Sequence, residues 1–115
     1  MTREETLHRA IETFGVDAQM IKTVEEMAEL AQVIAKYAAI ILVPIRFTMT
    51  ESSDKTFFAH RDTLNAKLRE EMADVRIMLE QMEIIFGDTS EIQDAKLAQL
   101  TERMDEMEEQ QNDEK

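Results

Sequence analysis

Glycine and proline are nearly absent from this chain, and that scarcity restricts the folds it can adopt. Its 115 residues include two glycines and one proline, whereas Ala, Leu, Ile, Met, Glu, Gln and Lys dominate. Glycine and proline are the residues that most often end helices and form turns. The remaining composition is typical of helices and not of sheets or disordered chains. We therefore expect an all-α fold, and the length predicts a single domain over residues 1–115.

The spacing of apolar residues divides the chain into helices. The pattern fits four helices, at about 2–14, 17–42, 63–86 and from 88–90 onward. Thr2 and Glu5 form a capping box before the first helix, and Gly15 suits its end. Short connections favour antiparallel neighbours, so we expect an antiparallel bundle of about four helices. The apolar faces are wide, which fits a bundle that is completed by oligomerisation.

Two segments depart from the helical pattern. Residues 44–62 contain Pro44, the polar pair Ser52–Ser53 and the apolar pair Phe57–Phe58. A short helix and a flap both fit this segment. The tail at about 105–115 carries six acidic residues against one lysine, and we expect it to be solvated and frayed.

Two pairs of carboxylates share one spacing on two of the expected helices. Glu26 precedes Glu29, and Glu71 precedes Asp74, by three residues in each case. Residues three apart lie on one helix face, so each pair can direct two carboxylates to one point. Two facing helices would then supply oxygen ligands in a number that suits Mg²⁺, with Mn²⁺ possible. Taken alone, the pair on the earlier helix also fits a solvated surface.

Glu71 is the strongest single indication of a site. Its helical neighbours at minus seven, minus three, plus four and plus seven are all apolar, namely Leu64, Leu68, Val75 and Met78. An ionised carboxylate that projects from an apolar stripe is costly unless it meets a cation. A chain that needed only a core would carry Leu or Met at this position, so we interpret Glu71 as functional.

Residues 23–30, Thr-Val-Glu-Glu-Met-Ala-Glu-Leu, and residues 68–75, Leu-Arg-Glu-Glu-Met-Ala-Asp-Val, contain these acids. In this order they resemble the two signature helices of the all-alpha nucleoside triphosphate pyrophosphohydrolases, the MazG-like superfamily. The resemblance covers roughly residues 10–103. It implies Mg²⁺-dependent hydrolysis of a nucleoside or deoxynucleoside triphosphate to the monophosphate and pyrophosphate, plausibly for nucleotide-pool cleaning. It also implies a homodimer or homotetramer.

The resemblance implies roles for individual residues. The metal ligands would be Glu26, Glu29, Glu71 and Asp74. The catalytic candidates are Glu25 and Glu26. Glu25 would be an outer metal ligand, a residue that hydrogen-bonds to a metal ligand, or the base that orients the attacking water. The phosphate contacts would come from Lys96, Arg103 and Lys67, although ordinary surface cations are the alternative. The segment at about 44–62 is longer than the family's usual spacing, and we interpret it as an insertion that forms a lid, a dimer contact or a loop.

Composition argues against several other classes. The chain has no cysteine, which excludes disulfides, thiolate metal sites and a cysteine nucleophile. A formal net charge of −12 argues against a nucleic-acid partner, because phosphate contacts need Lys and Arg. We expect no secretory signal, because no apolar core follows the charged residues 1–5. We expect no membrane span, because the longest apolar run, residues 37–45, is too short. A cytoplasmic protein is therefore expected.

Other readings of the same residues are weaker. A di-iron carboxylate centre needs two Glu-x-x-His motifs, and only Glu5 with His8 has that spacing. We therefore expect His8 and His60 to be surface or structural residues. The main alternative is a non-catalytic acidic helical interaction module or an inactive relative of the enzyme, for which Met-rich apolar faces are suited. Such a module has no reason to place Glu71 and Asp74 opposite another acidic pair.

Overall fold

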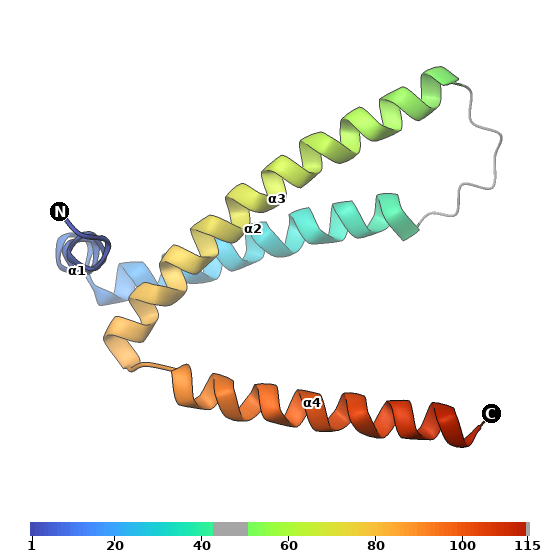
Figure 1. The fold of residues 1–115 in the computed structure, drawn as a ribbon. Helices are drawn as coiled ribbons and strands as arrows, with labels where there is room; N and C mark the ends of the chain where they lie inside the picture. The colour runs from blue at the N-terminus through green and yellow to red at the C-terminus, as the bar shows by residue number, and fades with distance from the viewer. Residues whose placement is uncertain (43–50, 115) are drawn as a thin grey trace. The chain divides into compact units, whose positions relative to one another are not determined.

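The structure, a computed structural model, describes residues 1–42 and 51–114, and within α2 and α3 it describes side chains for residues 16–40 and 60–86. The elements are α1 (Arg3–Phe14), α2 (Val16–Leu42), α3 (Glu51–Phe86) and α4 (Ser90–Asp113) (Figure 1). The expected all-α fold is confirmed for this part of the chain. No helix in it is both long and apolar enough to span a bilayer. The chain divides into two compact units, Met1–Ile85 and Phe86–Lys115.

The start and end of α1 follow the sequence signals. The Glu5 backbone N–H donates to Thr2 Oγ1 at 3.1 Å, and the Thr2 backbone N–H donates to Glu5 Oε2 at 3.3 Å. This reciprocal capping box confirms the predicted helix start. Gly15 follows the helix with a φ of 92° and donates its N–H to the Ile11 carbonyl at 2.8 Å. That backbone conformation is open to glycine at little cost, which explains why the helix ends here.

The third helix begins earlier than its sequence suggests. It was predicted from about Thr63, but α3 begins at Glu51. Of the two alternatives for residues 44–62, the described part from Glu51 onward is helical, and it continues α3 instead of forming a separate short helix. Serine and acidic residues favour turns and also favour the first turn of a helix, and neither glycine nor proline occurs between Glu51 and Phe86. Pro44 lies outside the described residues, and so do the side chains of Phe57–Phe58.

The acidic tail is also more regular than expected. The segment at about 105–115 was predicted to be frayed, but α4 continues to Asp113. Glu, Met and Gln are good helix formers, and the segment contains no breaker. The described residues of the tail are exposed.

Helices α2 and α3 form an antiparallel hairpin in the first unit (Figure 1). Their contacts run in opposite chain directions, because Gln19 meets Gln81 near one end and Arg61 donates to the Tyr37 hydroxyl at 3.3 Å near the other. The buried apolar side chains are Leu7, Val33, Leu64, Val75 and Met78. This narrow core lies along the line where the two long helices meet, with α1 adding Leu7.

A buried amide pair joins the two long helices. Gln19 Nε2 donates to Gln81 Oε1 at 2.6 Å, and Gln81 Nε2 lies 3.7 Å from Met78 Sδ. The exposed fractions of Gln19 and Gln81 are only 7% and 3%. Thr23, also buried, donates its hydroxyl to the Gln19 carbonyl at 2.7 Å. Because buried amides must be paired, this bond helps to fix which residues of α2 and α3 face each other.

We expect Gln81→Met to lower the free energy of unfolding by about 1–3 kcal/mol, because it leaves the buried Gln19 amide without its acceptor. The double variant Gln19→Met, Gln81→Met removes both partners at similar volume and should be close to the native chain. Urea unfolding followed by circular dichroism measures both. If the double variant were as unstable as the single one, packing and not the unpaired amide would explain the loss.

Candidate metal centre

The antiparallel hairpin brings three predicted ligands together. One carboxylate oxygen each from Glu26 on α2 and from Glu71 and Asp74 on α3 lies within 4.8 Å of the other two. Glu71 and Asp74 share a face because they are three residues apart, and the pairing of α2 with α3 places Glu26 opposite them. We call Glu26, Glu71 and Asp74 the acidic cluster.

Two oxygens of the acidic cluster are buried without a partner. Glu26 Oε2 and Glu71 Oε2 are inaccessible to solvent and accept no hydrogen bond. Glu26 as a whole is 6% exposed, whereas Glu71 is partly buried and Asp74 is exposed. A buried charged oxygen without a partner is strongly destabilising. A hard divalent cation such as Mg²⁺ fits this donor set, since it binds carboxylate oxygens.

The electrostatic field at the acidic cluster is negative. Burial raises the pKa of Glu71 above its usual value, and the charge of Glu29 raises it further. Asp74 and Glu26 act in the same direction, while Lys67 opposes them. The Glu71 carboxyl therefore resists ionising beside these acids unless positive charge is added, and a bound cation would supply that charge.

Two other acids of α2 lie at the margin of the acidic cluster. Glu29 is exposed and is not one of the three residues whose oxygens converge, although its charge acts on Glu71. Glu25 is exposed as well and lies outside the converging set. The roles predicted for Glu29 as a ligand and for Glu25 in catalysis stay predictions.

Lys22 is a member of the site that the sequence did not single out. Its Nζ lies 2.9 Å from Glu26 Oε1, and this ion pair raises the pKa of Lys22. The contact uses one oxygen of Glu26 and leaves Oε2 without a partner. The signal in the sequence is the spacing of four residues between the lysine and the glutamate, which is common on ordinary helix surfaces.

A pocket of about 520 Å³ is lined by residues of α1, α2 and α3, among them Lys22 and Glu25, and by no member of the acidic cluster. Its walls are largely apolar, with Phe14 and Ile21 among them, and the Gln19–Gln81 amide pair also lines it. Lys22 connects the pocket to the acidic cluster, because it lines the pocket and forms an ion pair with Glu26. The volume lies within the range of small-molecule sites.

The remaining candidates lie elsewhere on the chain. Lys67 is exposed on α3, and its charge reaches Glu71. Lys96 and Arg103 are exposed on one face of α4, in the second unit, and their contact with phosphate stays a prediction. His8 and His60 are exposed, as expected. Neither histidine belongs to the acidic cluster, so nothing in the described residues favours the di-iron alternative.

The chain matches no protein-family model, and comparisons with curated proteins and with solved structures find no match either. The case for a function therefore depends on residues 23–30 and 68–75 and on the chemistry of the acidic cluster.

Proposed function

We propose that this chain is a Mg²⁺-dependent hydrolase that splits a nucleoside or deoxynucleoside triphosphate into the monophosphate and pyrophosphate. The observation that carries the proposal is the acidic cluster, in which Glu26 and Glu71 each bury an oxygen that has no hydrogen-bond partner. A protein that used these carboxylates only for solubility would leave them in water. The resemblance to the MazG-like superfamily supplies the reaction, and the acidic cluster supports its requirement for a metal.

In the proposed site, Glu26, Glu71 and Asp74 hold the cation, and Glu29 adds negative charge beside them. Bound Mg²⁺ would neutralise the polyphosphate and lower the pKa of a water molecule. We assign to Glu25 the role of orienting that water and accepting its proton. The water oxygen forms a bond to the α-phosphorus, while the bond from that phosphorus to the bridging oxygen breaks and pyrophosphate leaves. We assign Lys67 of α3, whose charge acts on Glu71, to the phosphates.

The pocket that Lys22 connects to the acidic cluster is the place we propose for the nucleoside. Its apolar walls suit the faces of a ring, and its amides can exchange hydrogen bonds with ring edges. Lys22 stands between the pocket and Glu26, where the nucleoside would meet its phosphates. These contacts fit a nucleoside in general and do not select one base.

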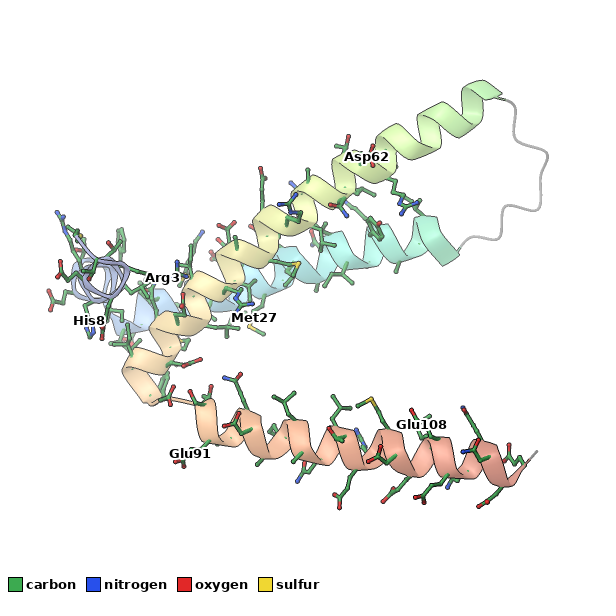
Figure 2. All side chains as sticks on the ribbon, in the orientation of Figure 1. Arg3, His8, Met27, Asp62, Glu91 and Glu108 are labelled. Atoms are coloured by element: carbon green, nitrogen blue, oxygen red, sulfur yellow. The ribbon has the colours of Figure 1, made fainter. Side chains whose placement is uncertain are left out.

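The proposal is tested by pyrophosphate release from a panel of ribonucleoside and deoxyribonucleoside triphosphates, including dUTP. We expect release from at least one nucleotide in Mg²⁺, with EDTA abolishing it and Mn²⁺ restoring it in part. Asp62→Asn is the control for protein quality, because Asp62 is an exposed acid of α3 outside the acidic cluster (Figure 2). No release from any nucleotide, or release that survives EDTA, would contradict the proposal.

One observation favours the alternative, an acidic helical interaction module. Several large apolar side chains of α2 are between 42% and 68% exposed, namely Met20, Ile21, Val24, Met27 and Ile34. A second copy of the chain would cover such a surface in a homodimer or homotetramer, and so would a different protein. Mg²⁺ binding that needs Glu71 separates the two functions, because an interaction module has no use for it.

A further inference from the structure

Helix α4 carries a narrow apolar stripe that the first unit's chemistry does not explain. Its members, Leu97, Leu100, Met104 and Met107, follow one another at intervals of three, four and three residues. Each of these side chains is between 46% and 59% exposed, and α4 has no buried residue. Helices in water owe most of their stability to packing of an apolar face, so this stripe requires a partner. We call these four residues the seam.

The spacing of the seam is that of a two-stranded coiled coil. In a heptad labelled a to g, Leu97 and Met104 take position a, while Leu100 and Met107 take position d. The flanking charges are Lys96 and Arg103 at position g, and Asp94 and Glu108 at position e. The remaining acids of α4 lie outside the seam, at positions b, c and f: Glu91, Glu102, Asp105, Glu106, Glu109 and Asp113.

The flanking charges distinguish the two possible directions of a partner helix. In a parallel pair, position g faces position e of the partner's next heptad, so Arg103 faces Glu108 of the second copy, with opposite charges. Two-fold symmetry creates this contact twice. In an antiparallel pair, g faces g and e faces e, which brings Arg103 to a lysine or arginine and Glu108 to an acid. Charge complementarity therefore favours a parallel partner with the same sequence.

We propose that α4 binds the α4 of a second copy of this chain as a short parallel coiled coil, in register, along the seam. Ser90, Gln93 and Gln111 are polar residues at the next a and d positions, so the apolar contact is limited to two heptads. Arg103 then serves the seam and not a phosphate. The proposal is independent of the metal centre and of the reaction proposed above.

Thiol crosslinking of the full chain tests the seam and its direction. The native sequence has no cysteine, so one introduced thiol reports one position. We expect Gln93→Cys and Gln111→Cys, at opposite ends of the seam, each to crosslink to itself with a short bis-maleimide. When the two variants are mixed, a crosslink between the thiol at position 93 of one chain and the thiol at position 111 of another should form in low yield at most, because these positions lie at opposite ends of a parallel pair. Ala95→Cys, at position f on the far side of the helix, is the matched control and should stay uncrosslinked.

Charge reversal tests the proposed contact between Arg103 of one copy and Glu108 of the second copy. The Glu108 side chain projects from α4 (Figure 2). On the Gln111→Cys chain, Arg103→Glu places like charges opposite each other twice and should reduce the crosslinking rate about tenfold. Adding Glu108→Arg restores opposite charges and the native net charge, and the rate should return to within about twofold of its starting value. Circular dichroism of both variants checks that the helices persist.

Three results would overturn the proposal. Crosslinks that form only in the mixture of Gln93→Cys and Gln111→Cys would show an antiparallel pair. The absence of any crosslink, with the chain folded, would mean that a surface other than α4 covers the seam. A rate unchanged by Arg103→Glu would remove the charge contact on which the direction depends.

Discussion

Asp74→Asn is expected to reduce pyrophosphate release by more than about a hundredfold in saturating Mg²⁺. The change keeps the size of the side chain and one of its oxygens but removes the charge that completes the acidic cluster with Glu26 and Glu71. Even groups that only support metal ligands contribute about 10- to 100-fold to affinity or activity, so loss of a ligand should exceed that range. The same change should weaken Mg²⁺ binding, which isothermal titration measures separately from turnover.

The matched control for this expectation is Asp62→Asn on the same helix. Asp62 is exposed and lies outside the acidic cluster, so the same chemical change there should leave release and Mg²⁺ affinity within about twofold. Native protein at a Mg²⁺ concentration of about a hundred times the dissociation constant should gain about 2.7 kcal/mol in free energy of unfolding. Asp74→Asn should lose most of this gain. Equal activity of Asp74→Asn and Asp62→Asn would exclude the acidic cluster from the reaction.

The helices that were predicted well are those whose ends carry unambiguous local signals. At each end of α1 the signal involves only residues about one turn apart: Thr2 with Glu5 at the start, and Gly15 with Ile11 at the end. The local sequence is therefore enough to predict where this helix begins and ends. The start of α3 at Glu51 was missed because serine and acidic residues occur both in loops and in the first turn of a helix. Local composition cannot decide between those states when the contacts that stabilise the helix come from another part of the chain.

The acidic cluster was predictable in part for a similar reason. Spacing places Glu71 and Asp74 on one face, and the apolar neighbours of Glu71 indicate that this face is covered. Spacing does not tell how far α2 is rotated about its axis, and that rotation decides why Glu26 belongs to the cluster while Glu29 does not. The Gln19–Gln81 bond joins residues 62 positions apart, so no local pattern could have revealed it.

Glu71 has opposite effects in the two states of the proposed site. With a cation, its carboxylate is a ligand, whereas without one its Oε2 is buried beside other acids and has no partner. Functional sites commonly reduce the stability of the empty fold in this way. Stability and metal binding should therefore respond in opposite directions when Glu71 is replaced by an apolar residue of similar length.

Glu71→Met is accordingly expected to raise the urea midpoint of the metal-free protein at pH 7 and to abolish the further rise that Mg²⁺ gives the native chain. The pKa of Glu71 is raised in the folded state, so the native fold binds this proton more tightly than the unfolded chain does. The stability that comes from the protonated carboxyl is fully present below the ordinary carboxyl pKa and is lost as the pH rises through the folded value. The advantage of Glu71→Met should therefore be largest at neutral pH and shrink in acid.

Urea titrations at several pH values, each with EDTA and with Mg²⁺, measure both effects in one design. Glu70→Met, which changes the adjacent exposed acid of α3, should neither stabilise the EDTA-treated protein nor remove its response to Mg²⁺. If Glu71→Met lowers the midpoint in EDTA, the Glu71 carboxylate stabilises the empty fold and its buried oxygen is not a sign of a vacant ligand. If Glu71→Met raises the midpoint but the native protein shows no response to Mg²⁺, the Glu71 carboxylate does destabilise the empty fold, and it serves a ligand other than this cation. Only both results together, a more stable metal-free Glu71→Met protein and its lost response to Mg²⁺, show that the destabilising Glu71 carboxylate is a metal ligand, because each result alone has a simpler explanation.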